Sequence, residues 1–289
     1  MTGSILITGA TGYVGKWFVR HCEGLGITPH LLVRPGSMTE SETVHHYDGS
    51  ATSLKKIFSQ HQYETVVHIA AKTSVSHTAN DVDELLDANI RFGTLLAETM
   101  VNAGCHRLLT IGSYWQNFHT LDYRPVNLYA ATKQALIDIL QYYCDASGLR
   151  VVELKLFDNY GPDDDRGKLL SQLMELSQNG GEIGVTPGEQ ELNLLHIKDV
   201  AAGIYHALDY IDQADAGVES FYLADDTNYT LQQVVALIQQ HAGQQFTVNF
   251  GERSYREREV MTIPQGIRRL PDWHPERTLE QGLQELLQA

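Results

Sequence analysis

The sequence predicts an α/β fold in which a parallel sheet is covered by helices on both faces. Its 289 residues are 43% apolar, which is enough to bury a large core. Short, nearly continuous apolar runs alternate with longer segments in which apolar residues recur every three or four positions. Continuous apolar strands indicate a sheet buried on both faces, and right-handed crossovers between such strands give a doubly wound parallel sheet.

The expected strands and helices alternate through the first half of the chain. Strands are predicted at residues 4–8, 31–34, 65–70, 107–112 and 150–157, and long helices at residues 82–103 and 128–147. After residue 157 the pattern changes to shorter helices at 169–177 and 231–241, separated by turn-rich stretches. We expect this half to form a smaller lobe, which is discontinuous because residues 196–210 return to the main sheet.

Composition and charge argue against several classes of protein. A net charge of −15 disfavours a nucleic-acid partner, which needs a clustered basic surface. We expect a cytoplasmic protein that does not enter membranes, since no secretion signal or bilayer-length apolar run is visible. Three cysteines, Cys22, Cys105 and Cys144, form no CxxC pair, and the acidic run 163–165 resembles a solvated loop. No metal site is therefore expected.

A glycine-rich turn between the first strand and the following helix is the clearest binding motif. Residues 5–15 read ILITGATGYVG. Gly9 and Gly12 allow a tight turn and the approach of a pyrophosphate to the helix N-terminus, whereas Gly15 allows the helix to pack on the strand. An accidental glycine turn is the alternative, but the next strand completes a βαβ unit. The expected cofactor contacts here are Gly9, Thr11, Gly12, Tyr13, Val14 and Gly15.

This motif predicts a Rossmann-type domain, and the strand that follows indicates the preferred cofactor. The dinucleotide-binding domain would comprise residues 1–157 and about 192–212, and the substrate-binding lobe residues 158–191 and 213–289. The second strand ends in Arg34, where an NAD enzyme usually has an acidic residue for the ribose hydroxyls. A guanidinium suits a 2′-phosphate, so NADP(H) is preferred over NAD(H). The other interpretation of Arg34 is an ordinary surface charge.

Three residues from separate parts of the sequence form a candidate catalytic set. Tyr129 and Lys133 are four positions apart on a predicted helix and therefore share one face. A neighbouring ammonium favours the phenolate, so we expect Lys133 to lower the pKa of Tyr129 while reaching the cofactor. Ser113 follows the strand at 107–112, at the edge where an open α/β sheet presents its ligands. Its hydroxyl would bind the substrate oxygen that Tyr129 protonates.

The glycine loop, the strand-end serine and the Tyr/Lys pair occur in the order typical of the short-chain dehydrogenase/reductase superfamily, which the chain resembles over nearly its whole length. The segment HIAA at 68–71, Asn89 and the pair DG at 48–49 resemble signatures of its extended branch. The cofactor contacts that this resemblance implies are Asp48, Gly49, Ala70, Ala71, Tyr129 and Lys133.

Segments of the second half resemble those that hold a nucleotide sugar in this branch. They are LFDNYGP at 156–162, HIKDV at 196–200 and YR at 255–256. Residues 110–116 (TIGSYWQ) and 125–133 (PVNLYAATK) look most similar to CDP-paratose and CDP-abequose synthases, which reduce a 4-keto sugar on CDP. The implied substrate contacts are Thr73, Ser113, Asp158, Asn159, Lys168 and Arg256.

Two positions depart from the pattern of the branch. Asp158 stands where asparagine is usual, and Leu192 stands where arginine is usual before HIKDV. A carboxylate at position 158 would repel a diphosphate, so we expect Asp158 to orient other groups. Arg256 is then the first candidate for a diphosphate ligand, because a planar guanidinium suits phosphate, and Lys168 is the second. An ordinary surface charge is the alternative for both.

The resemblance implies an NADPH-dependent reductase of the 4-keto group of a CDP- or dTDP-linked 4-keto-6-deoxy or 3,6-dideoxy hexose. An NAD-dependent 4-epimerase is the main alternative, and a non-catalytic NADP-sensing regulator is another. Dehydration is disfavoured because Tyr114-Trp115 replaces the expected Asp-Glu pair, and an epimerase-reductase of the GDP-fucose type because no cysteine is near Ser113. A homodimer through the helices at 82–103 and 128–147 is also expected.

Overall fold

A parallel sheet is the centre of the computed structural model, which describes residues 4–37, 39, 41 and 43–288. Within these residues seven strands form the sheet in the order β11-β6-β5-β4-β1-β2-β3, and neighbouring strands are parallel. The strands are β1 (Ile5–Thr8), β2 (His30–Val33), β3 (Val44–His46), β4 (Thr65–His68), β5 (Arg107–Ser113), β6 (Arg150–Leu156) and β11 (Gly217–Leu223). The chain moves outward from β1 in both directions, so the predicted doubly wound fold is confirmed.

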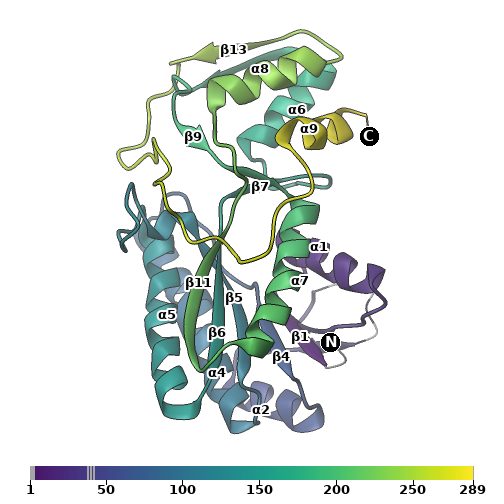
Figure 1. The fold of residues 1–289 in the computed structure, drawn as a ribbon, viewed down its shortest axis with the longest axis vertical. Helices are drawn as coiled ribbons and strands as arrows, with labels where there is room; N and C mark the ends of the chain where they lie inside the picture. Colours follow the sequence, from purple (N-terminus) through teal and green to yellow (C-terminus); the bar gives the residue numbers. More distant parts are fainter. Residues whose placement is uncertain (1–3, 38, 40, 42, 289) are drawn as a thin grey trace.

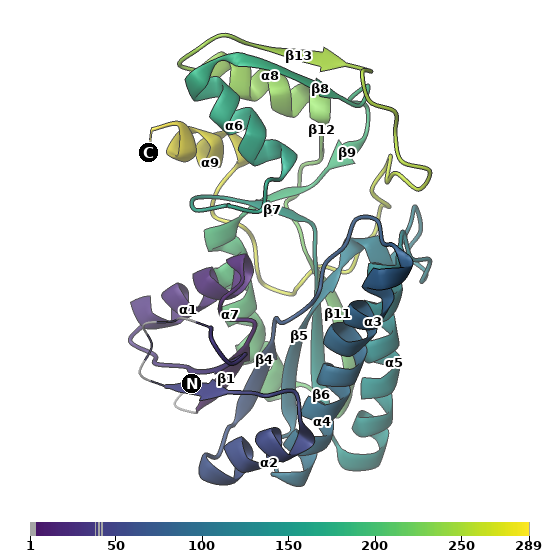
Figure 2. The same ribbon diagram turned by 180° about the vertical axis from the view of Figure 1, so that it is seen from behind.

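Helices cover both faces of this sheet (Figures 1 and 2). Helices α1 (Tyr13–Gly24) and α7 (Ile197–Gln213) pack on one face, and α2 (Ala51–Gln60), α4 (Phe92–Asn102) and α5 (Leu128–Ser147) pack on the other. Alternation along β1 explains the two layers, because Ile5 and Ile7 join the core beneath α1 while Leu6 joins the core beneath α2. Removal of these apolar side chains from water is the main force that holds the layers together.

A smaller lobe lies beyond the carboxyl ends of the strands, at the top of Figure 1. Its helices are α6 (Leu169–Asn179), α8 (Leu231–His241) and α9 (Leu279–Leu287). Its strand pairs are β7 (Asp158–Tyr160) with β10 (Leu194–His196), β8 (Gly181–Val185) with β13 (Phe246–Phe250), and β9 (Glu191–Leu192) with β12 (Tyr229–Thr230). Leu173, Leu231 and Leu283, from its three helices, are almost completely buried in one apolar core.

The boundary expected at residue 213 differs from the structure. Strand β11 falls in the range assigned to the lobe, yet it pairs with β6 along its whole length as the edge of the main sheet. Strand β11 was not predicted from the sequence because it contains polar residues, and an edge strand does not need a continuous apolar run. Glu219 forms an ion pair with Arg268, and Ser220 bonds a buried carboxylate on β6. Residues 196–210 return to the main sheet as expected, because helix α7, which begins at Ile197, packs on one of its faces.

The helix expected at 82–103 is also divided in the structure. It comprises α3 (Val82–Leu86), a π-helical turn (Asp87–Arg91) and α4. Such turns insert an extra residue into a helix and occur frequently at functional sites. Here the turn carries the fully buried Asn89.

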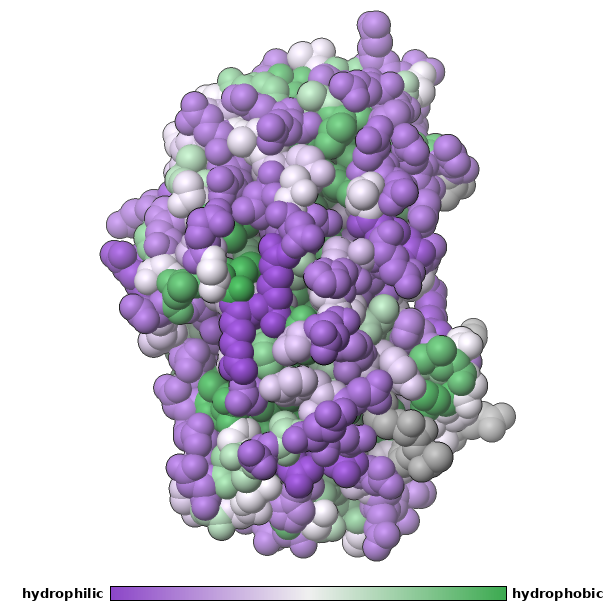
Figure 3. All heavy atoms as spheres, in the orientation of Figure 1, coloured by the Kyte–Doolittle hydropathy of each residue, from purple (hydrophilic) through white to green (hydrophobic). Residues whose placement is uncertain are grey.

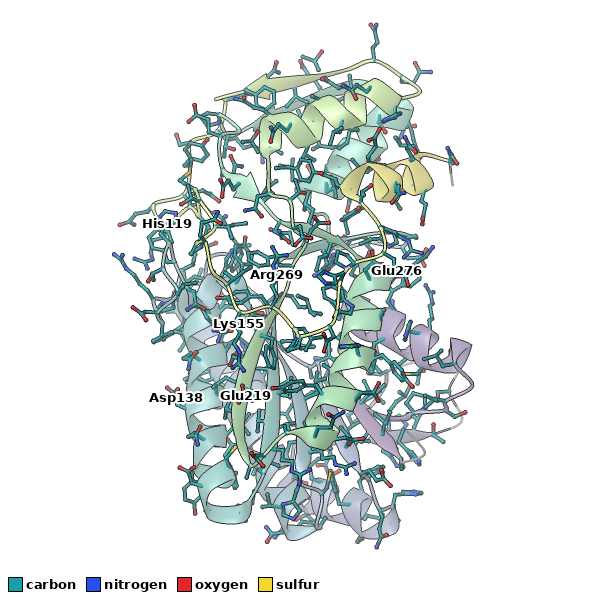
Figure 4. All side chains as sticks on the ribbon, viewed as in Figure 1. His119, Asp138, Lys155, Glu219, Arg269 and Glu276 are labelled. Atoms are coloured by element: carbon teal, nitrogen blue, oxygen red, sulfur yellow. The ribbon has the colours of Figure 1, made fainter. Side chains whose placement is uncertain are left out.

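The C-terminal segment runs past the outer edge of β11, where Figure 4 labels Arg269. The backbone N–H of Tyr222 donates to the carbonyl of Arg268, and the N–H of Leu270 donates to the carbonyl of Tyr222. These bonds satisfy backbone groups that an open sheet edge would leave free. The C-terminal segment therefore ties the lobe to the main sheet.

The surface in Figure 3 is mostly hydrophilic, with apolar side chains in small separate groups on the face shown. Among the described residues, no helix combines the length and apolar character that a bilayer crossing requires.

A buried ion pair fixes the first turn of α7 to the chain before α9. The carboxylate of Asp199 is 2% exposed and accepts from the Arg277 guanidinium at 2.8 Å. Arg277 also contacts Glu285 at 3.1 Å, whereas the pair between Lys198 and Glu285 is about two-fifths exposed. The HIKDV segment therefore uses its aspartate to hold the fold together.

Burial raises the pKa of Asp199, so its charge is favourable only through its partner. We expect Asp199→Asn to lower the free energy of unfolding by about 2 kcal/mol, since it leaves the partly buried Arg277 guanidinium without this carboxylate. Lys198→Gln is the control and should cost less than about 1 kcal/mol, because its ion pair is exposed to water. Denaturant unfolding at neutral pH measures both. Equal effects of the two substitutions would contradict the role given to the buried pair.

Candidate active site

The glycine loop joins β1 to α1 at the carboxyl edge of the sheet. Gly9 has a φ of 74°, and a Cβ at this position would lie 2.5 Å from the backbone nitrogen of Ala70. A Cβ at Gly15 would lie 2.1 Å from the carbonyl oxygen of Gly9. Larger residues are therefore excluded from both positions, as the motif predicts.

Among the described residues, no side chain caps the N-terminus of α1. Gly12 occupies the N-cap position, and the first turn has no acidic residue. Thr11 and Gly12 are exposed, Val14 is half-buried, and Tyr13 and Gly15 are buried. Uncapped N–H groups at the positive end of a helix are a suitable site for a pyrophosphate.

The remaining candidate cofactor residues lie along the same edge of the sheet. Arg34 follows β2 and is exposed, and its positive charge repels that of Lys72. Asp48 and Gly49 follow β3, where the Asp48 carboxylate accepts from the N–H of Ser50 at 2.9 Å. Ala70 and Ala71 follow β4, and the N–H of Ala70 donates to the Thr8 hydroxyl at 3.2 Å. The structure thus brings the ends of β1 to β4 together around one edge.

Ser113 is the last residue of β5 and is buried in a hydrogen-bonded turn. Its N–H donates to the side chain of Gln116 at 2.8 Å, and its hydroxyl accepts from the N–H of Trp115 at 3.2 Å. Gln116 in turn donates to the carboxylate of Glu153 at 2.8 Å. A Cβ at Gly112 would lie 2.5 Å from that carboxylate, so the glycine makes room for the network beneath Ser113.

Tyr129 and Lys133 lie on the first two turns of α5, and both are almost completely buried. Burial raises the pKa of the Tyr129 hydroxyl to about 12. Burial also lowers the pKa of the Lys133 ammonium to about 8, although the charge of Glu153 opposes this shift. In the protein alone the pKa of Tyr129 is therefore set by burial, and it moves in the direction opposite to the one expected from Lys133.

Asn89 connects the π-helical turn to helix α5. Its amide group donates to the carbonyl of Lys72 and to the Thr132 hydroxyl, both at 2.9 Å, and its carbonyl accepts from the N–H of Lys72 at 2.8 Å. Thr132 lies between Tyr129 and Lys133 and donates to the carbonyl of Tyr129. Asn89 therefore holds the segment after β4 against the catalytic face of α5.

Thr73 lies in the exposed loop that follows this segment. The neighbouring carbonyl of Ser74 accepts from the side chain of Asn127 at 3.1 Å. Asn127 also caps the N-terminus of α5 by accepting from the N–H of Ala130. Thr73 thus lies near the start of the catalytic helix, but the structure gives its own side chain no specific partner among the described residues.

Asp158 links the turn that follows Ser113 to the lobe. Its carboxylate accepts from the Tyr114 hydroxyl at 3.2 Å and from the Lys168 ammonium at 3.1 Å. Tyr114 directly follows Ser113, so the Asp158 carboxylate contacts one side chain next to this serine and one from the lobe. Asn159 is buried beside it, and its side-chain carbonyl has no hydrogen-bond partner within the described residues.

Arg256 reaches the same turn from the other side of the lobe. Its guanidinium lies 5.4 Å from the centre of the Trp115 ring, and that ring packs edge-on against Tyr129 at 6.3 Å. Glu259 accepts from Arg256 at 2.8 Å and raises the pKa of the guanidinium. Arg256 and Lys168 are therefore both near the catalytic turn, and each already has a carboxylate partner.

Two further arginines lie in this region and were not predicted from the sequence. Arg258 donates to the carbonyls of Val126 and Pro125 at 3.1 and 2.7 Å, which attaches the segment carrying Arg256 to the start of α5. The Arg166 guanidinium lies 4.0 Å from the centre of the Tyr13 ring, beside the glycine loop. The exposed, charged composition of their loops gave no signal that distinguished either residue from a surface charge.

Comparisons with known proteins show the family and the fold of the chain. A model described as the NAD dependent epimerase/dehydratase family matches residues 5–220. The CDP-abequose synthase of Yersinia pseudotuberculosis is 26% identical over 272 residues, covering 89% of this chain and 90% of that enzyme.

Solved structures with the same fold include two epimerases. The UDP-glucose 4-epimerase of Thermotoga maritima, solved with UDP-glucose, has a TM-score of 0.84 at 19% identity and covers 99% of this chain and 97% of its own. The UDP-glucose 4-epimerase of Thermus thermophilus, solved with NAD, has a TM-score of 0.80 at 18% identity, with coverage of 99% and 98%. At these identities the likeness shows the fold.

We expect Lys133→Met to stabilise the ligand-free protein at pH 7 by about 2–3 kcal/mol, because it removes a buried charge whose pKa lies well below its ordinary value. The wild-type protein binds fewer protons when folded than when unfolded between about pH 8 and 10.5, so its stability rises with pH in that window. The difference between the two proteins should therefore shrink there. Denaturant unfolding at several pH values measures it, with the exposed Lys72→Met as the control. A difference in stability between the two proteins that stays constant from about pH 8 to 10.5 would contradict the lowered pKa of Lys133.

Proposed function

The chain belongs to the NAD dependent epimerase/dehydratase family, and from that premise we propose that it is an NADPH-dependent reductase of the 4-keto group of a nucleotide-linked deoxyhexose. Members of this family form a class of NAD(P)-dependent oxidoreductases and isomerases. The single observation that carries the proposal is the buried Ser113, Tyr129 and Lys133 set next to an uncapped glycine loop. The resemblance to CDP-abequose synthase supports the choice of substrate.

The site's own residues suit a nicotinamide nucleotide. The N–H groups at the start of α1 would bind its pyrophosphate, and the missing Cβ atoms of Gly9 and Gly15 let the loop and the helix pack closely enough to present these groups at the edge of the sheet. Lys133 would bind the ribose hydroxyls at the floor of the site. When bound, the reduced nicotinamide supplies the hydride.

The proton chemistry follows from the environment of Tyr129. With a pKa of about 12, its hydroxyl stays protonated at neutral pH, which is the form that a proton donor needs. Ser113 would donate a hydrogen bond to the substrate oxygen as negative charge develops there. Lys133 would stabilise the phenolate that remains after the proton leaves, because an adjacent cation favours the charged form.

The lobe supports an anionic, nucleotide-linked substrate. Asp158 fixes Tyr114 and Lys168, so its carboxylate is occupied and the ammonium lies close to the catalytic turn. Arg256 lies over Trp115 and presents a planar fork of donors suited to phosphate oxygens. A diphosphate would have to draw Arg256 away from Glu259 or share it.

The preference for NADP(H) rests on Arg34 and its neighbour Lys72. Both cations lie near the end of β2, where the ribose of the adenosine half is expected, and a 2′-phosphate would reduce the repulsion between them. Lys72 already pairs with Glu84, so Arg34 is the better candidate ligand.

We also propose a homodimer that works in the cytoplasm. Helices α3, α4 and α5 line one side of the molecule in Figure 2, and on them Leu86 and Tyr142 are 41% and 65% exposed. Apolar side chains at such positions suit a helical interface between two copies.

The first test uses a CDP- or dTDP-4-keto-6-deoxyhexose generated by a dehydratase, with absorbance of the reduced nicotinamide as the signal. We expect stoichiometric consumption of NADPH, and a loss of at least about 100-fold in Tyr129→Phe, because the substitution removes the proton donor. Tyr123→Phe, at an exposed tyrosine, should leave the rate unchanged.

An NAD-dependent 4-epimerase is the alternative that this assay separates. It uses the same three residues but returns the hydride to the sugar. Interconversion of 4-epimers of a nucleotide sugar without net cofactor consumption would replace the reductase by the epimerase. Cofactor binding without any turnover would instead favour a regulator.

We expect Arg34→Ser to raise the KM for NADPH at least about tenfold and to leave that for NADH nearly unchanged, since only NADPH carries the phosphate that the guanidinium would bind. Arg268→Ser, far from this edge, is the control. Steady-state kinetics with both cofactors provide the values. An equal loss for NADPH and NADH would assign Arg34 another role.

A further inference from the structure

Three histidines meet at the edge of the main sheet, away from the active site. His30 is the first residue of β2, His45 is in the middle of β3, and His61 ends α2. The active site lies at the carboxyl ends of the strands, whereas His30 opens β2 at its amino end. None of these histidines has a part in the proposed reductase, so their proximity needs a separate explanation.

The three imidazoles converge through their ring nitrogens. One nitrogen from each ring lies within 4.8 Å of the nitrogens from the other two. The Nδ1 atom of His30 and the Nε2 atom of His45 are 2.8 Å apart, and their rings stack with centres 5.1 Å apart. The Tyr63 hydroxyl lies 3.3 Å from the same Nε2 atom of His45.

We propose that His30, His45 and His61 form a binding site for a divalent transition-metal ion, with Zn²⁺ as the best fit. Bonds from zinc to imidazole are about 2.0–2.1 Å long, so tetrahedral ligand nitrogens lie roughly 3.3 Å apart. The His30 and His45 nitrogens need to separate by about 0.5 Å to reach this spacing. His61 is exposed at the end of a helix and is free to close the remaining distance.

Neutral imidazole is the form of histidine that binds metals. The Nδ1 atom of His30 and the Nε2 atom of His45 lie 2.8 Å apart and share one proton. When both lone pairs turn to the metal, that proton moves to the other nitrogen of its own ring, so no net proton is released.

The type of donor atom favours transition metals over Mg²⁺ and Ca²⁺, which prefer oxygen ligands. Three imidazoles leave a fourth tetrahedral position, which water would fill. The bound ion would connect β2, β3 and the end of α2, which are otherwise joined at the edge of the sheet through β2–β3 pairing and side-chain packing. Its direct effect is therefore on the stability of this edge.

The test uses untagged, full-length protein that has been freed of metal with a chelator and then titrated with Zn²⁺ by calorimetry. We expect one strong site per chain, and a rise in the unfolding temperature on metal addition. His61→Gln should weaken binding at least about tenfold and remove the rise in unfolding temperature. Since His61 is exposed, this substitution should leave folding and NADPH binding unchanged.

His46→Gln is the matched control. His46 follows His45 in β3, so its side chain points to the opposite face of the sheet, and it is not part of the cluster. The His46→Gln variant should bind Zn²⁺ with the same affinity as the wild type. The proposal is overturned if the wild type lacks a strong site, if His61→Gln binds as tightly as the wild type, or if both variants lose affinity equally. These results do not depend on the reductase assay.

Discussion

The close approach of the glycine loop to two neighbouring pieces of backbone sets the geometry of the whole site. Gly9 lies against Ala70, and Gly15 lies against Gly9, at distances that leave no space for a Cβ. Helix α1 can therefore start directly at the end of β1, with its uncapped N–H groups at the edge of the sheet. The ends of β2, β3 and β4 meet at this same edge, because they are parallel to β1.

A second constraint is the buried polar network beneath Ser113. Glu153 is 1% exposed in the middle of β6, where an unpaired carboxylate would be very unfavourable. Gln116 and Ser220 each donate a hydrogen bond to it, and the Lys155 ammonium lies 3.9 Å away. Figure 4 labels Lys155 in the centre of the molecule, close to where the C-terminal segment crosses the strands. The network fixes Gln116, and through Gln116 the backbone of Ser113.

The fold class was predictable because interior strands and helices each produce a recognisable pattern within a short stretch of sequence. An interior strand such as β1 is a nearly continuous apolar run, and α5 begins and ends where the periodicity indicates. Edge strands carry less of this signal, so β11 was placed in the lobe although it completes the main sheet. The glycine, serine and Tyr/Lys positions were predictable from motifs. Arg258, Arg166 and the three-histidine cluster were not, since their partners are distant in sequence and only folding brings them together.

The low pKa of Lys133 links the occupancy of the site to protons in solution. In the ligand-free protein burial lowers the pKa of this ammonium to about 8, and the charge of Glu153 only partly compensates. An anionic nucleotide bound nearby would favour the charged form and raise the pKa. Under the proposed function, binding near or above this pH would take up a proton, and affinity would fall as the pH rises further. The burial of Lys133 would thus make the affinity for the cofactor depend on pH above neutrality.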